Sequence, residues 1–307
     1  MNYHSKLKYA IALICFSFLN LCCNAQSTGM ASGTDGTSIF YKTFGSGKPL
    51  LIINGGPGMN SGGFEGLAIK LSKTNHTIIY DQRGTGKSSL QKQDTSTITM
   101  KLMIDDIESL RKELKIEKWS VLGHSFGGIL ASYYASQYPG SIDKIILSSS
   151  GGIDLDLLNY VSAAINSRLS AEEQDSVKYW NEKISNGDTS HYAKLKRGMF
   201  LASAYVFNKK YVPVIGERLT QSNQLINQLV WTNLQKIHYD CSDKLSSFNN
   251  PVLIIQGRQD ILKPETAEKS HKAFKNSRVV FIEHCVHYGW LDNEEEYFKE
   301  VNSFLAE

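Results

Sequence analysis

Short, nearly continuous runs of apolar residues, each followed by turn residues, recur along the chain. Runs of this length, rich in β-branched residues, are typical of β-strands. Because they are apolar throughout, both faces of each strand are expected to be buried, as in a parallel sheet. The runs cover residues 50–54, 77–81, 119–123, 144–148, 252–256 and 278–282, and a strand at 38–43 is expected within an opening hairpin.

Helical patterns lie between these strands. One of them repeats apolar residues at helical spacing, at Met103, Ile107, Leu110 and Leu114. Either Thr97 or Thr99 is available as its N-cap. Another stretch, 126–138, is small and apolar and stops at Pro139-Gly140. Alternating strands and helices predict an α/β fold with a mostly parallel sheet flanked by helices.

The alternation stops between about Ile153 and Tyr239, where the composition is helical. Helices are expected at 157–169, 171–185, 190–204 and 219–235. Because the strand pattern resumes at Pro251, we interpret this stretch as a helical cap inserted between two core strands, rather than as an independent domain. The predicted organisation is a signal peptide at 1–25, a core in two parts at 26–152 and 241–307, and the cap at 153–240.

The N-terminus has the pattern of a targeting segment. Lys6 and Lys8 precede an apolar stretch of about thirteen residues, and Ala25 precedes the expected cleavage point. A bilayer span needs about 20 apolar residues, which this stretch does not supply. We therefore predict an exported protein, periplasmic or secreted, without stable membrane contact after cleavage. The alternative is a lipoprotein acylated on Cys22 or Cys23.

Charge and cysteine content narrow the function classes. The formal net charge of +3 falls to +1 without Lys6 and Lys8, so nucleic-acid binding is not expected. Only Cys241 and Cys285 follow the signal segment; their pairing stays open, and two buried thiols are the simpler interpretation. No CxxC or HExxH spacing occurs, so neither a metal nor a cofactor is predicted. The expected partner is a small molecule or a short peptide.

The sequence Gly123-His124-Ser125-Phe126-Gly127 follows a predicted strand and precedes a predicted helix. This G-x-S-x-G pattern is typical of a nucleophilic serine on a sharp strand-to-helix turn, where side chains at the two glycine positions would clash. Ser125 is therefore the predicted nucleophile. A serine hydroxyl needs a base, and the base needs an orienting acid.

The acid and the base are expected later in the chain, each after a strand and in that order. Asp260 follows the strand at 252–256, and His287 follows the strand at 278–282. His284 is the competing base, but it lies so close to the strand end that little chain remains to reach Ser125. We predict the triad Ser125, His287 and Asp260.

Two backbone N–H groups are expected to stabilise the oxyanion. One belongs to Phe126, at the start of the helix after the nucleophile. The other is expected in the turn Asn54-Gly55-Gly56-Pro57-Gly58, with Gly56 as the candidate. The run Gly84-Thr85-Gly86-Lys87-Ser88 ends like a phosphate-binding loop, but Asp81 stands where that motif needs its first glycine. Phosphate binding is excluded.

Three motifs resemble the proline iminopeptidase branch of the α/β-hydrolases: the glycine-rich turn at 55–58, the run Asp81-Gln82-Arg83-Gly84-Thr85-Gly86-Lys87-Ser88, and the elbow at Ser125. The stretch 287–292 also resembles the segment around the family's catalytic histidine. The resemblance implies removal of an N-terminal residue, often proline, from short peptides, with cap carboxylates binding the amine. Asn54 replaces the family's usual histidine, and His124-Ser125-Phe126 replaces its common Gly-Ser-Trp.

We therefore predict a serine hydrolase that forms an acyl-Ser125 intermediate, with an aminopeptidase as the leading hypothesis. Among the cap acids, none of which matches the family's amine-binding pattern, Glu217 is the first candidate for the amine and Glu182 the second. A small-molecule esterase, lactonase or amidase is the alternative enzyme. A catalytically inactive binding protein is the alternative from another class.

Overall fold

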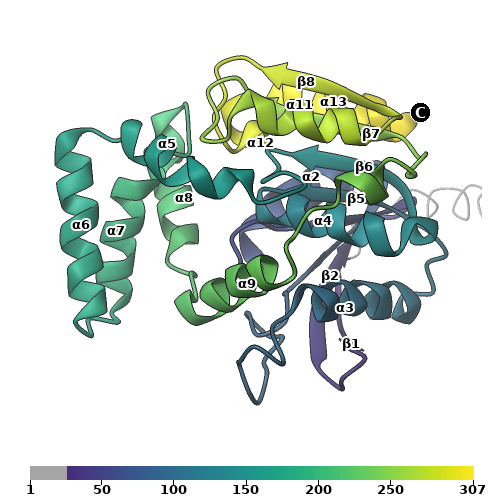
Figure 1. The fold of residues 1–307 in the computed structure, drawn as a ribbon, viewed down its shortest axis with the longest axis horizontal. Helices are drawn as coiled ribbons and strands as arrows, with labels where there is room; N and C mark the ends of the chain where they lie inside the picture. The colour runs from purple at the N-terminus through teal and green to yellow at the C-terminus, as the bar shows by residue number, and fades with distance from the viewer. Residues whose placement is uncertain (1–25) are drawn as a thin grey trace, which may run out of the picture.

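The computed structural model describes residues 26–307, and the predicted signal segment at 1–25 lies outside them. The described chain forms an eight-stranded sheet in the order β1-β2-β4-β3-β5-β6-β7-β8 (Figure 1). The strands are β1 (Ser27–Ser32), β2 (Ser38–Phe44), β3 (Lys48–Ile53), β4 (Asn75–Tyr80), β5 (Trp119–His124), β6 (Ile142–Ser148), β7 (Val252–Gly257) and β8 (Ser277–Ile282). The pairs β1–β2 and β2–β4 are antiparallel and the other neighbouring pairs are parallel, so among these eight strands β2 alone runs against the rest. The predicted fold class is confirmed.

Helices cover both faces of the sheet because alternate residues of each central strand point to opposite sides. In β3, Leu51 and Ile53 join one apolar core, whereas Leu50 and Ile52 join the other. The first core includes α3 (Met100–Glu113), α4 (Phe126–Gln137) and α11 (Pro264–Ala273); the second includes α2 (Glu65–Leu71) and α13 (Glu294–Ala306). Because each face of the sheet packs against its own apolar core, the central strands are apolar at successive positions and do not alternate with polar residues.

The start of α3 shows which of the two predicted caps is used. The Thr99 hydroxyl accepts from the Leu102 N–H at 3.2 Å, which satisfies one of the unpaired donors of the first turn. Thr97 lies outside the helix, and its hydroxyl donates to the Lys92 carbonyl. The N-cap is Thr99.

A helical insertion separates β6 from β7 and stands beside the sheet (Figure 1). It contains α5 (Val161–Ser167), α6 (Ala171–Ser185), α7 (His191–Ala202), α8 (Val212–Leu219) and α9 (Gln224–Lys236), after which α10 (Ser242–Leu245) returns to the core. The helix expected at 219–235 is wrong at its start. Leu219 ends α8, and α9 begins after Asn223, whose side chain accepts from the Ile226 N–H at 3.2 Å as an N-cap.

The strand order creates the position for a site. From β3 the chain moves outward to β4 and then returns to place β5 on the other side of β3, so the loops after β3 and β5 diverge. Ligands bind in the crevice at such a switch point, at the carboxyl ends of the strands. The loop after β3 holds the turn 54–58, and Ser125 directly follows β5.

Candidate active site

Ser125 occupies the sharp turn between β5 and α4. Its φ of 55° and ψ of −119° lie outside the regions that non-glycine residues prefer, so the backbone is strained. The Ser125 N–H donates to the Ser148 carbonyl at 3.1 Å, which ties the strained residue to β6. A Cβ on Gly127 would collide with the Ile53 carbonyl, so the turn fits against β3 only without a side chain there.

Asp260 and His287 form a buried pair. Nδ1 of His287 lies 2.9 Å from Oδ1 of Asp260, and His287 is 2% exposed. Their strands are neighbours, since β7 pairs with β8 up to Gly257 opposite Ile282. A Cβ on Gly257 would collide with the carbonyls of Cys285 and Val286, so this glycine permits the His287 loop to approach.

Ser125 and His287 line one cavity of about 310 Å³ beneath the insertion. The hydrogen bonds of residues 26–307 do not include one between the Ser125 hydroxyl and His287; in ligand-free enzymes such bonds often tighten only when substrate binds. His284 is exposed, stacks with Phe207 at 5.3 Å between ring centroids, and does not line the cavity. The structure therefore brings together the three residues of the predicted triad and leaves His284 outside.

The two predicted oxyanion donors, Gly56 and Phe126, lie in the loop after β3 and at the first residue of α4, and both line the same cavity. Within the described chain, neither backbone N–H donates to a protein acceptor. Backbone donors without partners at the wall of a cavity are suited to a developing negative charge.

The run 81–88 supports the turn that holds Gly56. Nε2 of Gln82 donates to the Asn54 carbonyl at 2.9 Å. Asp81 accepts from the Ser61 N–H and hydroxyl at 2.9 and 2.8 Å and from the Lys87 N–H at 2.8 Å. The motif that carries the family resemblance thus has a structural role behind the turn 54–58.

His124, the residue before the nucleophile, is 1% exposed and packs among aromatic rings. Its ring centroid lies 4.7 Å from that of His287 and 4.8 Å from that of Trp290. Neither ring nitrogen has a hydrogen-bond partner in the described structure. Burial, with the nearby charges of His287 and Arg218, holds the pKa of His124 well below its usual range. The folded protein therefore favours the neutral form of the His124 ring.

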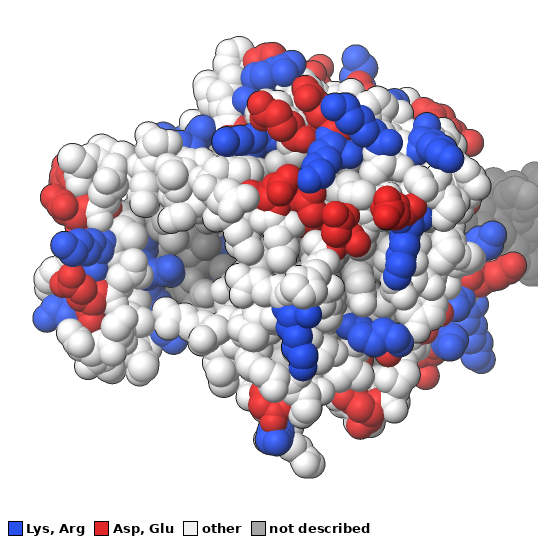
Figure 2. Space-filling model, in the orientation of Figure 1, with Lys and Arg blue, Asp and Glu red and all other residues white. Residues whose placement is uncertain are grey.

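Two arginines of the insertion line the cavity, Arg197 from α7 and Arg218 from α8. Burial lowers the pKa of both, although arginine remains protonated at neutral pH. Among the described residues, no aspartate or glutamate lines this cavity. Figure 2 shows the molecule hollowed between the insertion and the core, with basic side chains along the insertion's side of the hollow.

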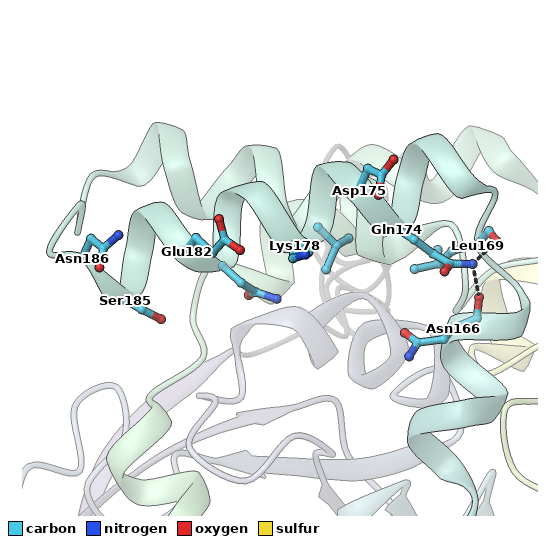
Figure 3. A pocket seen from close by; sticks show the side chains of 10 residues that line it. Asn166, Leu169, Gln174, Asp175, Lys178, Glu182, Ser185 and Asn186 are labelled. Carbon is cyan, nitrogen blue, oxygen red and sulfur yellow. Dashed lines mark hydrogen bonds between the residues drawn. The ribbon is translucent and has the colours of Figure 1, made fainter.

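The glutamates predicted for amine binding lie elsewhere. The Glu217 side chain is 57% exposed and faces His191, with 3.4 Å between Oε2 and Nε2. Glu182 lines a separate open hollow along α6, beside Lys178 and Ser185 (Figure 3). The structure does not bring either carboxylate into the cavity with Ser125.

Disulfides, metal sites and membrane-spanning helices are three other kinds of feature that the described residues could contain. Cys241 and Cys285 are both buried and free, so no disulfide joins them. Within residues 26–307, no group of three or more histidine, cysteine or acidic side chains is arranged to hold a metal ion. None of the helices in this part of the chain has the length and apolar character needed to cross a membrane.

The family model for the α/β-hydrolase fold matches residues 48–294. The chain belongs to this family. A proline iminopeptidase from Lactobacillus helveticus (strain DPC 4571) is 28% identical over 281 residues, covering 88% of this chain and 95% of the relative. The expected likeness to the proline iminopeptidase branch is confirmed. The chain is therefore a hydrolase.

Solved structures agree on the fold. An esterase from Exiguobacterium antarcticum superposes with a TM-score of 0.70 at 21% identity, covering 91% of this chain and 99% of the other. A proline iminopeptidase from Mycobacterium smegmatis superposes with a TM-score of 0.69 at 20% identity, covering 91% and 98%. Esterase and peptidase chemistry therefore occur on the same scaffold, and the fold does not select between them.

Three residues of the site were not predicted: His124, Arg197 and Arg218. His124 is visible in the sequence as a departure from the Gly-Ser-Trp of the resembling family. The two arginines have no local motif, because only the packing of α7 and α8 against the core brings them to the cavity.

Proposed function

We propose that this α/β-hydrolase cleaves the acyl bond of a small ester or amide through an acyl-Ser125 intermediate. The observation that carries the proposal is that His287, paired with the buried carboxylate of Asp260, lines the same cavity as Ser125. An imidazole held by a carboxylate is the base that a serine hydroxyl needs.

In this mechanism the Ser125 Oγ attacks the carbonyl carbon while Nε2 of His287 takes the hydroxyl proton. Asp260 holds the Nδ1 proton in place and stabilises the imidazolium that forms. The N–H groups of Gly56 and Phe126 donate to the oxyanion; such donors are each worth about 10²–10³ in rate.

Collapse of the intermediate completes the cycle. His287 gives its proton to the leaving alcohol or amine, and the acyl group remains on Ser125. Water then attacks the acyl carbon as His287 takes its proton, which releases the carboxylic acid and restores the serine hydroxyl.

The proline iminopeptidase relatives favour a second candidate, an aminopeptidase acting on short peptides. Recognition of a substrate ammonium in a partly dry pocket calls for a carboxylate. The cavity of the described chain offers arginines and no acid, while Glu217 and Glu182 lie outside it. This lining supports the ester or amide substrate as the first candidate.

One set of assays tests the nucleophile and the substrate class. Fluorophosphonate labelling and hydrolysis of short-chain nitrophenyl esters are measured for the wild type, Ser125→Ala and Ser132→Ala. Ser132 is a buried serine of α4 outside the cavity and serves as the matched control. We expect Ser125→Ala alone to lose labelling and at least 10³-fold in kcat. Equal labelling of all three proteins would rule out Ser125, and a wild type that is never labelled would favour a binding protein.

The same wild-type protein is assayed on prolyl and alanyl arylamides, free and N-acetylated. We expect the free-amine arylamides to be cleaved no faster than their acetylated forms. A preference of 10-fold or more for the free amine would instead establish the aminopeptidase.

We also propose that residues 1–25 are a signal peptide and that the mature protein works in the periplasm or outside the cell. The basic start, the short apolar stretch and Ala25 support this. N-terminal sequencing of the exported protein should begin at Gln26. A protein that retains Met1 in the cytoplasm, or an acylated Cys22 or Cys23, would contradict it.

A further inference from the structure

The arginines of the described chain fall into two groups. Those of the core are ion-paired with carboxylates: Arg83, Arg111, Arg258 and Arg278. Within residues 26–307, the three arginines of the insertion have no ion pair: Arg168, Arg197 and Arg218. Two of these three line the cavity that contains Ser125. A partly desolvated cation without an anion is costly unless a ligand supplies one.

The guanidinium of Arg197 is positioned to bind an anion in the cavity. Its Nε donates to Asn181 Oδ1 at 2.6 Å, which fixes the plane of the guanidinium against α6. Neither Nη1 nor Nη2 has an acceptor within the described residues, and the side chain lines the cavity. Two neighbouring N–H donors in one plane match the two oxygens of a carboxylate.

Arg218 is already occupied. Its Nη2 donates to the Gly55 carbonyl at 2.9 Å, and its guanidinium carbon lies 4.7 Å from the centre of the Phe64 ring. It adds positive charge to the cavity, but its donors face the protein. Arg197 is therefore the arginine available for contact with a ligand.

We propose that the substrate carries a carboxylate group and that Arg197 binds it. This inference rests on the proposed function, since the cavity is that of Ser125. The remaining walls include Leu157, Val161, Ile165, Leu201 and Trp231, so the carboxylate is joined to the reacting bond by an apolar body. The positive cavity also repels a free amine, which separates this substrate class from that of the relatives.

The test compares matched esters with and without the charge. 4-Nitrophenyl hydrogen glutarate carries its carboxylate on the acyl side, and its methyl ester is the neutral match. 4-Acetoxybenzoate carries the carboxylate on the leaving group, and its methyl ester is again the neutral match. For the wild type we expect kcat/KM to favour the charged member of one pair by at least 10-fold, because a charge-assisted pair in a partly dry site is worth about that or more.

Variants then assign the effect to Arg197. Arg197→Gln should lower the charged-to-neutral ratio by 10-fold or more, and Arg197→Lys should keep part of it. Lys194→Gln removes one positive charge from the same helix outside the cavity and should keep the ratio. Circular dichroism checks that each variant is folded.

Binding gives a second measurement that does not depend on turnover. Calorimetry with the Ser125→Ala protein should detect the two charged esters, and adding Arg197→Gln should weaken the tighter one by at least 10-fold. If Arg197→Gln changes neither the charged-to-neutral ratio of kcat/KM nor the affinity for the charged esters, the inference is overturned and the Ser125 mechanism stays intact. Ester hydrolysis that survives Ser125→Ala would instead overturn the proposed function.

Discussion

The Nη2 atom of Arg218 lies 2.9 Å from the carbonyl oxygen of Gly55, which joins α8 of the insertion to the turn after β3. Nδ2 of Asn54 donates to the same carbonyl at 3.0 Å. Because a trans peptide is planar, fixing the Gly55 carbonyl also fixes the opposite direction of the Gly56 N–H. The insertion thereby orients the N–H of Gly56, the proposed oxyanion donor, as well as covering the cavity.

Arg218→Met should therefore lower kcat on a neutral nitrophenyl ester by about 10- to 100-fold, less than the full loss of an oxyanion donor. The Michaelis constant should change far less, because the donor acts mainly on the transition state. Steady-state kinetics measure the two parameters. Arg168→Met removes an insertion arginine that lies outside the cavity and whose Nε–H donates to the Ala204 carbonyl, and it should leave kcat near the wild-type value. A loss confined to KM would contradict the orienting role.

His287→Ala should lower kcat on the same ester by at least 10³-fold, because Ser125 then has no base. His284→Ala is the matched control, since His284 is exposed and lies three residues earlier in the same loop. It should retain wild-type kcat. Loss of activity in His284→Ala with retention in His287→Ala would reverse the assignment.

His124 predicts a dependence of stability on pH. Its pKa is lowered in the folded protein, so below about pH 6.5, the usual pKa of histidine, the unfolded chain binds a proton that the folded chain does not. The free energy of unfolding should therefore fall as pH falls below that value, with a contribution of up to about 1.4 kcal/mol per pH unit.

His124→Phe tests this contribution, because an apolar ring replaces an imidazole whose nitrogens have no hydrogen-bond partner among residues 26–307. Urea unfolding at pH 8, 7, 6 and 5 should show a shallower loss of stability for the variant below pH 6.5. Parallel curves for the two proteins would mean that His124 does not titrate on unfolding.

Gly127→Ala should destabilise the protein by about 2–4 kcal/mol, since the new methyl group would meet the backbone of Ile53 and could not be accommodated by a rotamer change. Gly140→Ala is the matched control, because a Cβ there meets nothing within 4 Å. Thermal unfolding of both variants measures the difference. Equal melting temperatures would show that β3 moves to accept the methyl group.

The sequence determined the parts of this protein that follow from local patterns. Apolar runs with turn residues predicted the central strands, and Thr99 was among the two caps expected for α3. The elbow at Ser125 could be predicted because its glycines are required by a close backbone contact. The order of Asp260 and His287 after their strands then indicated which side chains would meet.

The tertiary structure decided which charged side chains line the cavity. Whether Glu217 or Arg218 lines the cavity of Ser125 depends on the rotation of α8 about its axis and on how it docks against the core. Adjacent residues of a helix point about 100° apart. The sequence shows both residues side by side without their directions. Their roles could not be predicted because helix orientation results from contacts between segments far apart in the chain, such as Arg218 with Gly55.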